Sequence, residues 1–132
     1  MKYYDDSIST ICATTIQALK TLTDADTVLI GGMDRGIDYG ELIQFLSGSP
    51  IPHIVLMEAT GRRIYEEIGR DYPEFAGRDR LILADHLEEA VRAARSVTRP
   101  GHSCVLSPAA ASYGIFRNFE ERGEAFSRDV FE

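Results

Sequence analysis

Two segments of this chain combine side chains that could bind an anion with small residues that would let a ligand approach the backbone. Gly31-Gly32-Met33-Asp34-Arg35 follows an apolar run, and the Arg35 guanidinium could donate two parallel hydrogen bonds to a carboxylate or phosphate. Ser107 and Ser112 flank a run of small residues after another apolar run, and each offers a hydroxyl. A ligand often binds where a strand of an open α/β sheet turns into a helix, because free amide groups point into that crevice.

Each of these residues also has a purely structural interpretation. Ser is a preferred N-cap residue and Ser112 immediately precedes helical periodicity, so both serines could only cap and turn. The glycine segment matches neither GxGxxG nor GxxxxGK[ST], which leaves Arg35 equally compatible with a solvated loop. Near the start of the chain, Asp6 and Thr10 are typical of turn and cap chemistry. Residue types alone leave binding and structural roles open.

Composition excludes several classes of function. The net charge is −7 and the 14 basic residues are scattered, which argues against nucleic acid as a partner. No apolar run reaches the roughly 18 residues of a membrane span, and MKYYDDS lacks the apolar core of a secretory signal. Cys12 and Cys104 are far apart and belong to no CxxC, so neither a disulfide framework nor a zinc site is indicated, and a cytoplasmic location is expected.

Apolar runs alternate with amphipathic segments, which predicts one α/β domain over residues 1–132. We expect a Rossmann-like, mostly parallel sheet with helices on both faces. The predicted strands are an edge strand at 2–5 and core strands at 27–30, 53–57, 81–83 and 103–106. The predicted helices begin near Thr10, Tyr39, Gly61, His86 and Ser112. Gly48 is expected as a C′ glycine, and 71–80 as a polar connection. Because neighbouring strand ends form one crevice, segments 31–39 and 107–112 should lie side by side.

Three blocks carry a family resemblance: DDSIST at 5–10, LIGGMDRGIDY at 29–39 and LSPAAASYGIFRNFEERGEAF at 106–126. In their order and spacing they resemble the C-terminal domain of the Mur ligases, most of all the branch that joins D-glutamate to UDP-N-acetylmuramoyl-L-alanine. The resemblance implies a three-domain enzyme that uses ATP and magnesium and forms an acyl phosphate. A different domain carries the P-loop and the metal ions, so this chain resembles the third domain alone and is expected to be inactive by itself.

The resemblance also implies roles for individual residues. Thr10, Arg35, Ser112 and Phe119 would hold the incoming glutamate, and Asp6 would lie near the nucleotide ribose. Arg35 stands where well-known members have lysine, which keeps the positive charge. The resemblance carries no catalytic residue and no metal ligand over to this chain.

One departure keeps alternatives open. Ile8 occupies a position at which the family usually has lysine, so one cation near the nucleotide and the amino acid is missing. A relative that adds L-glutamate, a folylpolyglutamate synthase and a free-standing small-ligand binding module remain alternatives. The lack of a nucleophile with its base, or of a metal motif such as HExxH, argues against catalysis by this chain alone.

Overall fold

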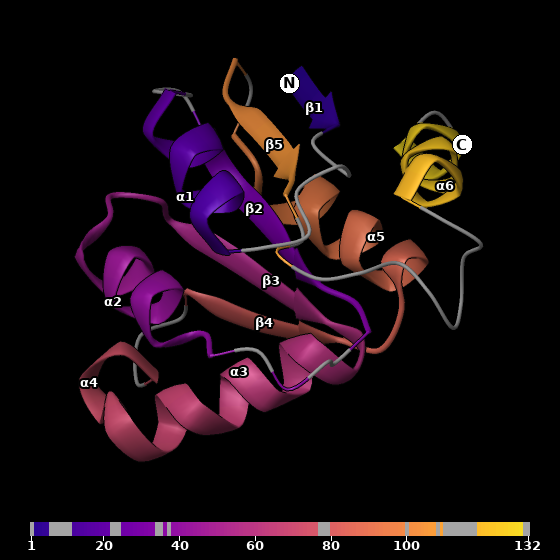
Figure 1. Cartoon of the computed structure of the whole chain (residues 1–132). Helices are drawn as coiled ribbons and strands as arrows, with labels where there is room; N and C mark the ends of the chain where they lie inside the picture. Colours follow the sequence, from indigo (N-terminus) through magenta and orange to yellow (C-terminus); the bar gives the residue numbers. More distant parts are fainter. Residues whose placement is uncertain are drawn as a thin grey trace.

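A computed structural model describes residues 2–5, 12–21, 25–33, 36, 38–76, 80–99, 101–107, 109 and 119–130. Within them, five parallel strands form one sheet in the order β1-β5-β2-β3-β4, with helices on both sides (Figure 1). The strands are β1 Lys2–Asp5, β2 Ala25–Gly31, β3 His53–Met57, β4 Leu81–Ala84 and β5 Ser103–Leu106. The helices are α1 Cys12–Thr21, α2 Gly40–Gly48, α3 Glu58–Asp71, α4 Pro73–Ala76, α5 Leu87–Val97 and α6 Phe119–Val130. The predicted α/β fold is confirmed.

Alternate residues of the central strands face two separate apolar layers. Val28, Ile54 and Val105 belong to one core with residues of α1 to α4. Their neighbours Leu29 and Val55 belong to the other, with residues of α5 and α6. Strand side chains alternate between faces, so a sheet covered on both sides needs uninterrupted apolar runs such as VLI and IVLM. Figure 1 shows α1 to α4 on one side of the sheet and α5 and α6 on the other.

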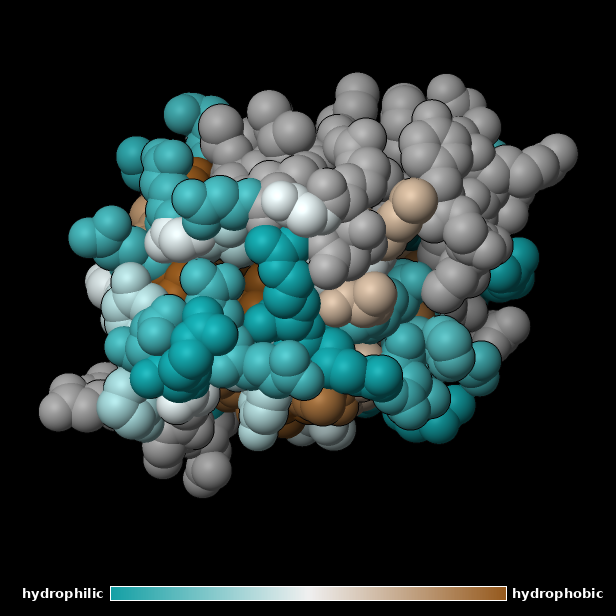
Figure 2. All heavy atoms as spheres, turned by 60° about the horizontal axis from the view of Figure 1, so that its bottom comes forward, coloured by the Kyte–Doolittle hydropathy of each residue, from teal (hydrophilic) through white to brown (hydrophobic). Residues whose placement is uncertain are grey.

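Helix α3 shows how the outer surface differs from these cores. Ile64 and Ile68 are fully buried, whereas Arg62, Glu66 and Arg70 are exposed on the opposite face. In Figure 2, which brings the bottom of Figure 1 forward, the coloured surface is mainly hydrophilic with small apolar areas between polar groups. This amphipathic pattern is what a helix that covers one face of a sheet requires.

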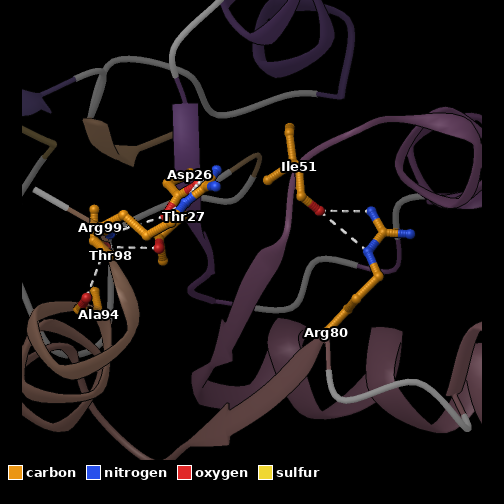
Figure 3. A network of polar contacts seen from close by, with 7 residues as sticks. All are labelled: Asp26, Thr27, Ile51, Arg80, Ala94, Thr98 and Arg99. Carbon is orange, nitrogen blue, oxygen red and sulfur yellow. Dashed lines mark hydrogen bonds and ion pairs between the residues drawn. The ribbon is translucent and has the colours of Figure 1, made fainter. Parts of the chain in front are cut away.

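Buried and half-buried polar contacts connect the amino ends of the strands (Figure 3). Asp26, only 1% exposed, accepts hydrogen bonds from the backbone N–H of Arg99 at 2.9 Å and from its guanidinium at 2.7 Å. The hydroxyls of Thr27 and Thr98 are 2.7 Å apart. Before β3 and β4, the guanidinium of Arg80 donates to the carbonyl of Ile51 at 2.8 Å. These contacts therefore have a structural role and link neighbouring segments at the amino ends of the strands.

Two predicted helix boundaries are wrong, for identifiable reasons. Helix α3 begins at Glu58 rather than Gly61. Gly61 lies inside the helix, where an added Cβ would be 2.6 Å from the Leu56 carbonyl carbon, so this glycine serves close packing and does not mark the helix start. Gly48 is the last residue of α2 and not a C′ glycine. The helix ends instead at an extended Ser49, whose hydroxyl donates to the Leu46 carbonyl at 2.9 Å, and Arg80 donates to the same carbonyl at 3.1 Å.

Two further expectations need correction. The polar connection contains the short helix α4, in which Phe75 is buried against the core. Strand β4 is not a core strand but an edge strand, and Leu83 is 45% exposed. An apolar run identifies a strand, but it does not distinguish a central place in the sheet from an edge.

We predict that Asp26→Asn destabilises the fold in a pH-dependent way. Burial raises the pKa of Asp26, but hydrogen bonds and positive charge from Arg99 lower it by more, so its net pKa is lowered. A lowered folded-state pKa stabilises the protein above the ordinary pKa, near 4, and this contribution is lost as pH falls through the folded value. At pH 7 the substitution should cost about 2 kcal/mol in urea unfolding, and the difference should shrink below about pH 4.

Asp71→Asn provides the matched control. Asp71 also pairs with an arginine, Arg70, at 3.1 Å, but both side chains are largely exposed. Its loss should change stability by less than about 0.5 kcal/mol. Equal effects of the two substitutions, or a pH-independent effect at Asp26, would contradict the prediction.

Candidate functional site

The carboxyl ends of three neighbouring strands bring together the three sequence blocks. Asp5 at the end of β1 pairs with Leu106 at the end of β5, and Leu106 also pairs with Leu29 near the end of β2. The backbone N–H of Ser107 continues this pairing by donating to the Leu29 carbonyl at 3.2 Å. Segments distant in sequence therefore leave the sheet side by side. The strand ends that lead into segments 31–39 and 107–112 are therefore neighbours, and the adjacency of the segments themselves stays a prediction.

The helices that follow these strands lie on opposite faces of the sheet. The helix after β1 and the helix after β2 pack in one apolar layer, whereas α6, which follows β5, contributes Ala125 and Phe126 to the other. Adjacent strands whose connections separate in this way leave a crevice at their carboxyl ends. The position between β5 and its two neighbours is therefore the candidate site.

Close backbone contact requires glycine at position 31, the last residue of β2, and two glycines with positive φ follow it. Gly31 has a φ of 141°, and a Cβ there would be 1.9 Å from the Met57 carbonyl oxygen. Gly32 has a φ of 155°, and its carbonyl accepts the backbone N–H of Thr60 at 3.0 Å. Gly36 has a φ of 73° in open space. Glycine therefore lets β2 run directly across the end of β3 into its loop.

Ser107 has a structural role at the site. Its hydroxyl donates to Thr15 Oγ1 at 3.2 Å, and Thr15 Oγ1 is also 3.2 Å from the Ser107 carbonyl oxygen. Both side chains are fully buried. The contact fixes α1, the helix that follows the first block, against the end of β5 in the third block. Sequence reasoning missed Thr15, because a threonine inside a helix carries no local sign of a partner so far along the chain.

Glu58 is a second residue that sequence reasoning missed. It follows β3 with a left-handed φ of 60°, uncommon for a residue other than glycine, and its Oε1 has no hydrogen-bond partner among the described residues. Burial raises the pKa of its carboxyl, although the positive charges of Arg122 and His86 act in the opposite direction. Arg122 is fully buried in α6. Acidic and basic groups from three elements therefore influence one another at this edge.

The structure describes few of the residues that the sequence predicts to bind substrate or nucleotide. Asp6, Thr10, Arg35 and Ser112 lie outside the described residues. Phe119 is the first residue of α6, so its backbone is placed on the helix that follows the third block. Their binding roles stay predictions.

Other chemistry within the described residues is limited. Burial raises the pKa of the Cys104 thiol to about 12, so this cysteine is a poor nucleophile at neutral pH. No group of three potential metal-ligating side chains occurs in the part of the chain that the structure describes. Across those same ranges, none of the helices has the length and apolar character needed to cross a membrane.

Comparison with known proteins identifies relatives along the whole chain. No family model matches it. A UDP-N-acetylmuramoylalanine--D-glutamate ligase of Thermoanaerobacter sp. (strain X514) is 35% identical over 100% of the chain. Ligases of the same name from Halalkalibacterium halodurans and Chlamydia caviae are 37% and 34% identical, each over 98% of the chain. The chain is homologous to the C-terminal domain of the Mur ligases. It spans only 28%, 27% and 29% of the lengths of these three Mur ligases.

We predict that Gly31→Ala is much more destabilising than Gly36→Ala. At Gly31 the new Cβ would overlap the Met57 carbonyl, so the ends of β2 and β3 must separate. Urea unfolding should show a loss of about 3 kcal/mol or more, against about 1 kcal/mol at Gly36, where only the positive φ disfavours alanine. Losses of similar size would mean that the close approach is unimportant.

Proposed function

We propose that this chain is the C-terminal, amino-acid-binding domain of an ATP-dependent ligase that adds D-glutamate to UDP-N-acetylmuramoyl-L-alanine in peptidoglycan precursor synthesis. One observation carries the proposal: the strands that precede or contain the three Mur-like blocks are adjacent and end at one edge of the sheet. A site assembled there would unite residues that are up to about a hundred positions apart. The 35% and 37% identity to D-glutamate ligases, over 100% and 98% of the chain, supports the choice of amino acid.

Within this site we assign each predicted residue a role. Arg35 would bind a glutamate carboxylate through two charge-assisted hydrogen bonds, which fixes its orientation as well as its affinity. The Ser112 hydroxyl and the Thr10 side chain would donate to carboxylate oxygens, and Phe119 would close the site at the start of α6. Asp6 would lie beside the nucleotide ribose. An amine held in this way is oriented to attack an activated acyl group.

ATP and magnesium do not fit a site made by this chain alone. The sequence has no GxxxxGK[ST] phosphate loop, and the described residues offer no cluster of three metal ligands. We propose that both are bound mainly by another part of a longer cytoplasmic enzyme, which also binds the UDP-linked substrate.

Two observations bear on the alternatives. The Ile8 departure would suit a relative that takes L-glutamate, because a cation near the amino acid is missing. The relatives named above are D-glutamate ligases, which favours that activity over a folylpolyglutamate synthase or a free-standing binding module. Kinetics with D- and L-glutamate would show directly which enantiomer the full-length enzyme uses.

Arg35→Ala in the full-length ligase should selectively weaken the use of glutamate. Loss of one partner of a desolvated charge pair costs on the order of 2–4 kcal/mol, which corresponds to roughly 30- to 1,000-fold in kcat/KM for glutamate. The KM values for ATP and the UDP-linked substrate should change far less, and Arg35→Lys should recover part of the loss. An unchanged glutamate dependence would identify Arg35 as a solvated loop residue.

The 132-residue chain alone should neither hydrolyse ATP nor form an amide bond. The physical reason is that the sequence lacks the phosphate loop on which phosphoryl transfer of this kind depends. Phosphate release with ATP, magnesium and D-glutamate should equal that of a buffer blank. Turnover by the purified chain would refute the domain assignment.

A further inference from the structure

A pocket lies between the last turns of α1 and α2, at the amino ends of β2 and β3. Its volume is about 560 Å³, within the range of roughly 300–1,000 Å³ that is typical of small-molecule sites. We call it the α1–α2 pocket, and its lining includes Leu19, Lys20, Ala25, Gln44, Phe45 and Ile51. Ala25 begins the seven-residue strand β2, whose length places the pocket about 20 Å from the carboxyl ends of the strands. The pocket is therefore separate from the proposed amino-acid site.

The interior of the α1–α2 pocket is mainly apolar. Leu19 and Ile51 are 6% and 5% exposed, and both belong to the core on this side of the sheet. Ala25 and Phe45 are half-buried and pack against the same core. Aromatic rings pack favourably against one another, so Phe45 favours a ring on the ligand. A flat apolar group would therefore be stabilised in the pocket by leaving water.

Arg80 fixes the wall of the pocket that connects α2 to β3 (Figure 3). Its guanidinium donates to the carbonyls of Leu46, Ser49 and Ile51 at 3.1, 3.2 and 2.8 Å. The same guanidinium lies 4.8 Å from the centre of the Phe75 ring. Because these contacts lie within the chain itself, the wall needs no ligand to form. A ligand that binds against a preformed wall causes a smaller loss of conformational entropy.

Two polar side chains contribute to the lining, and both are exposed. Lys20 belongs to the last turn of α1, and Gln44 belongs to α2. The Lys20 ammonium lies 5.9 Å from the centre of the Phe45 ring, at the outer limit of a cation–π contact. No carboxylate of the described residues forms an ion pair with Lys20. Its charge is therefore available to an anion placed beside the ring.

We propose that the α1–α2 pocket binds a small molecule that carries a flat apolar group and a single carboxylate. The apolar group lies against Phe45 and Ile51, and the carboxylate accepts a hydrogen bond from the Lys20 ammonium. Among the described lining residues, Lys20 carries the only charge, which suits one negative charge on the ligand. A ligand with several phosphates would be repelled by the net charge of −7. This inference concerns a second site and does not depend on the proposed function.

An NMR titration of the 132-residue chain tests the proposal, with cinnamate as the probe. Cinnamate should produce saturable shifts of the backbone amides centred on 19–20, 25 and 44–51, with little change at the strand ends 29–31 and 105–107. Cinnamamide has the same flat group without the charge, and it should bind roughly twofold to fivefold more weakly. Cinnamate shifts that do not saturate at the pocket, or ATP binding there as tightly as cinnamate, would overturn the proposal.

Two variants test the role of the ammonium. Lys20→Met keeps most of the apolar stem, so it should weaken cinnamate binding roughly twofold to fivefold and leave cinnamamide binding unchanged. Arg95→Met is the matched control, because Arg95 is also an exposed basic residue in the last turn of a helix, α5. It should change neither affinity. Unchanged cinnamate binding in Lys20→Met, or an equal loss in both variants, would contradict a carboxylate bound by Lys20.

Discussion

The pairing of β5 between β1 and β2 is the arrangement on which the rest of the molecule depends. The last strand of the sheet joins the first two, so the chain must return across the sheet after β4. That return leads α5 over the face opposite to α2 and α3, which creates the second apolar layer. The same pairing places the segment after β5 beside the segments after β1 and β2. One set of backbone hydrogen bonds thus determines the two-layer core and assembles the candidate site.

Different kinds of contact hold the elements together at the amino ends and at the carboxyl ends of the strands. At the amino edge, Asp26 with Arg99 and Thr27 with Thr98 satisfy one another as closed pairs. At the carboxyl edge, backbone contacts made possible by Gly31 and Gly61 bring elements together without side chains between them. Glu58 also lies at this edge, and no donor to its Oε1 occurs in the part of the chain that the structure describes. Among the described residues, unpartnered buried polar atoms occur at both edges, since His53 Nδ1 and Ser103 Oγ lie at the amino ends of β3 and β5.

Sequence patterns predicted the elements well where one physical signal was sufficient. Uninterrupted apolar runs identified β3 and β5, and the spacing of Leu87, Ala90, Val91 and Ala94 identified the buried face of α5. The prediction was wrong where tertiary contact decided the outcome. Gly61 suggested a helix start but serves a backbone approach, and the end of α2 is capped by Arg80 from a distant segment. Similarly, the sequence gives no sign that the adjacent residues Arg62 and Arg63 make different contacts. Arg63 lies over the Tyr39 ring, whereas Arg62 pairs with Asp85.

The exposed position of β4 has a consequence for the chain in solution. An edge strand presents backbone donors and acceptors that can pair with another strand, and exposed Leu83 adds apolar surface beside them. The neighbouring surface of α5 carries Glu89 and Arg92, both exposed. Charges beside an open edge oppose unwanted strand pairing, since a second chain would have to bury them. Strand pairing between copies at β4 should therefore be weak, and salt that screens these charges should promote it.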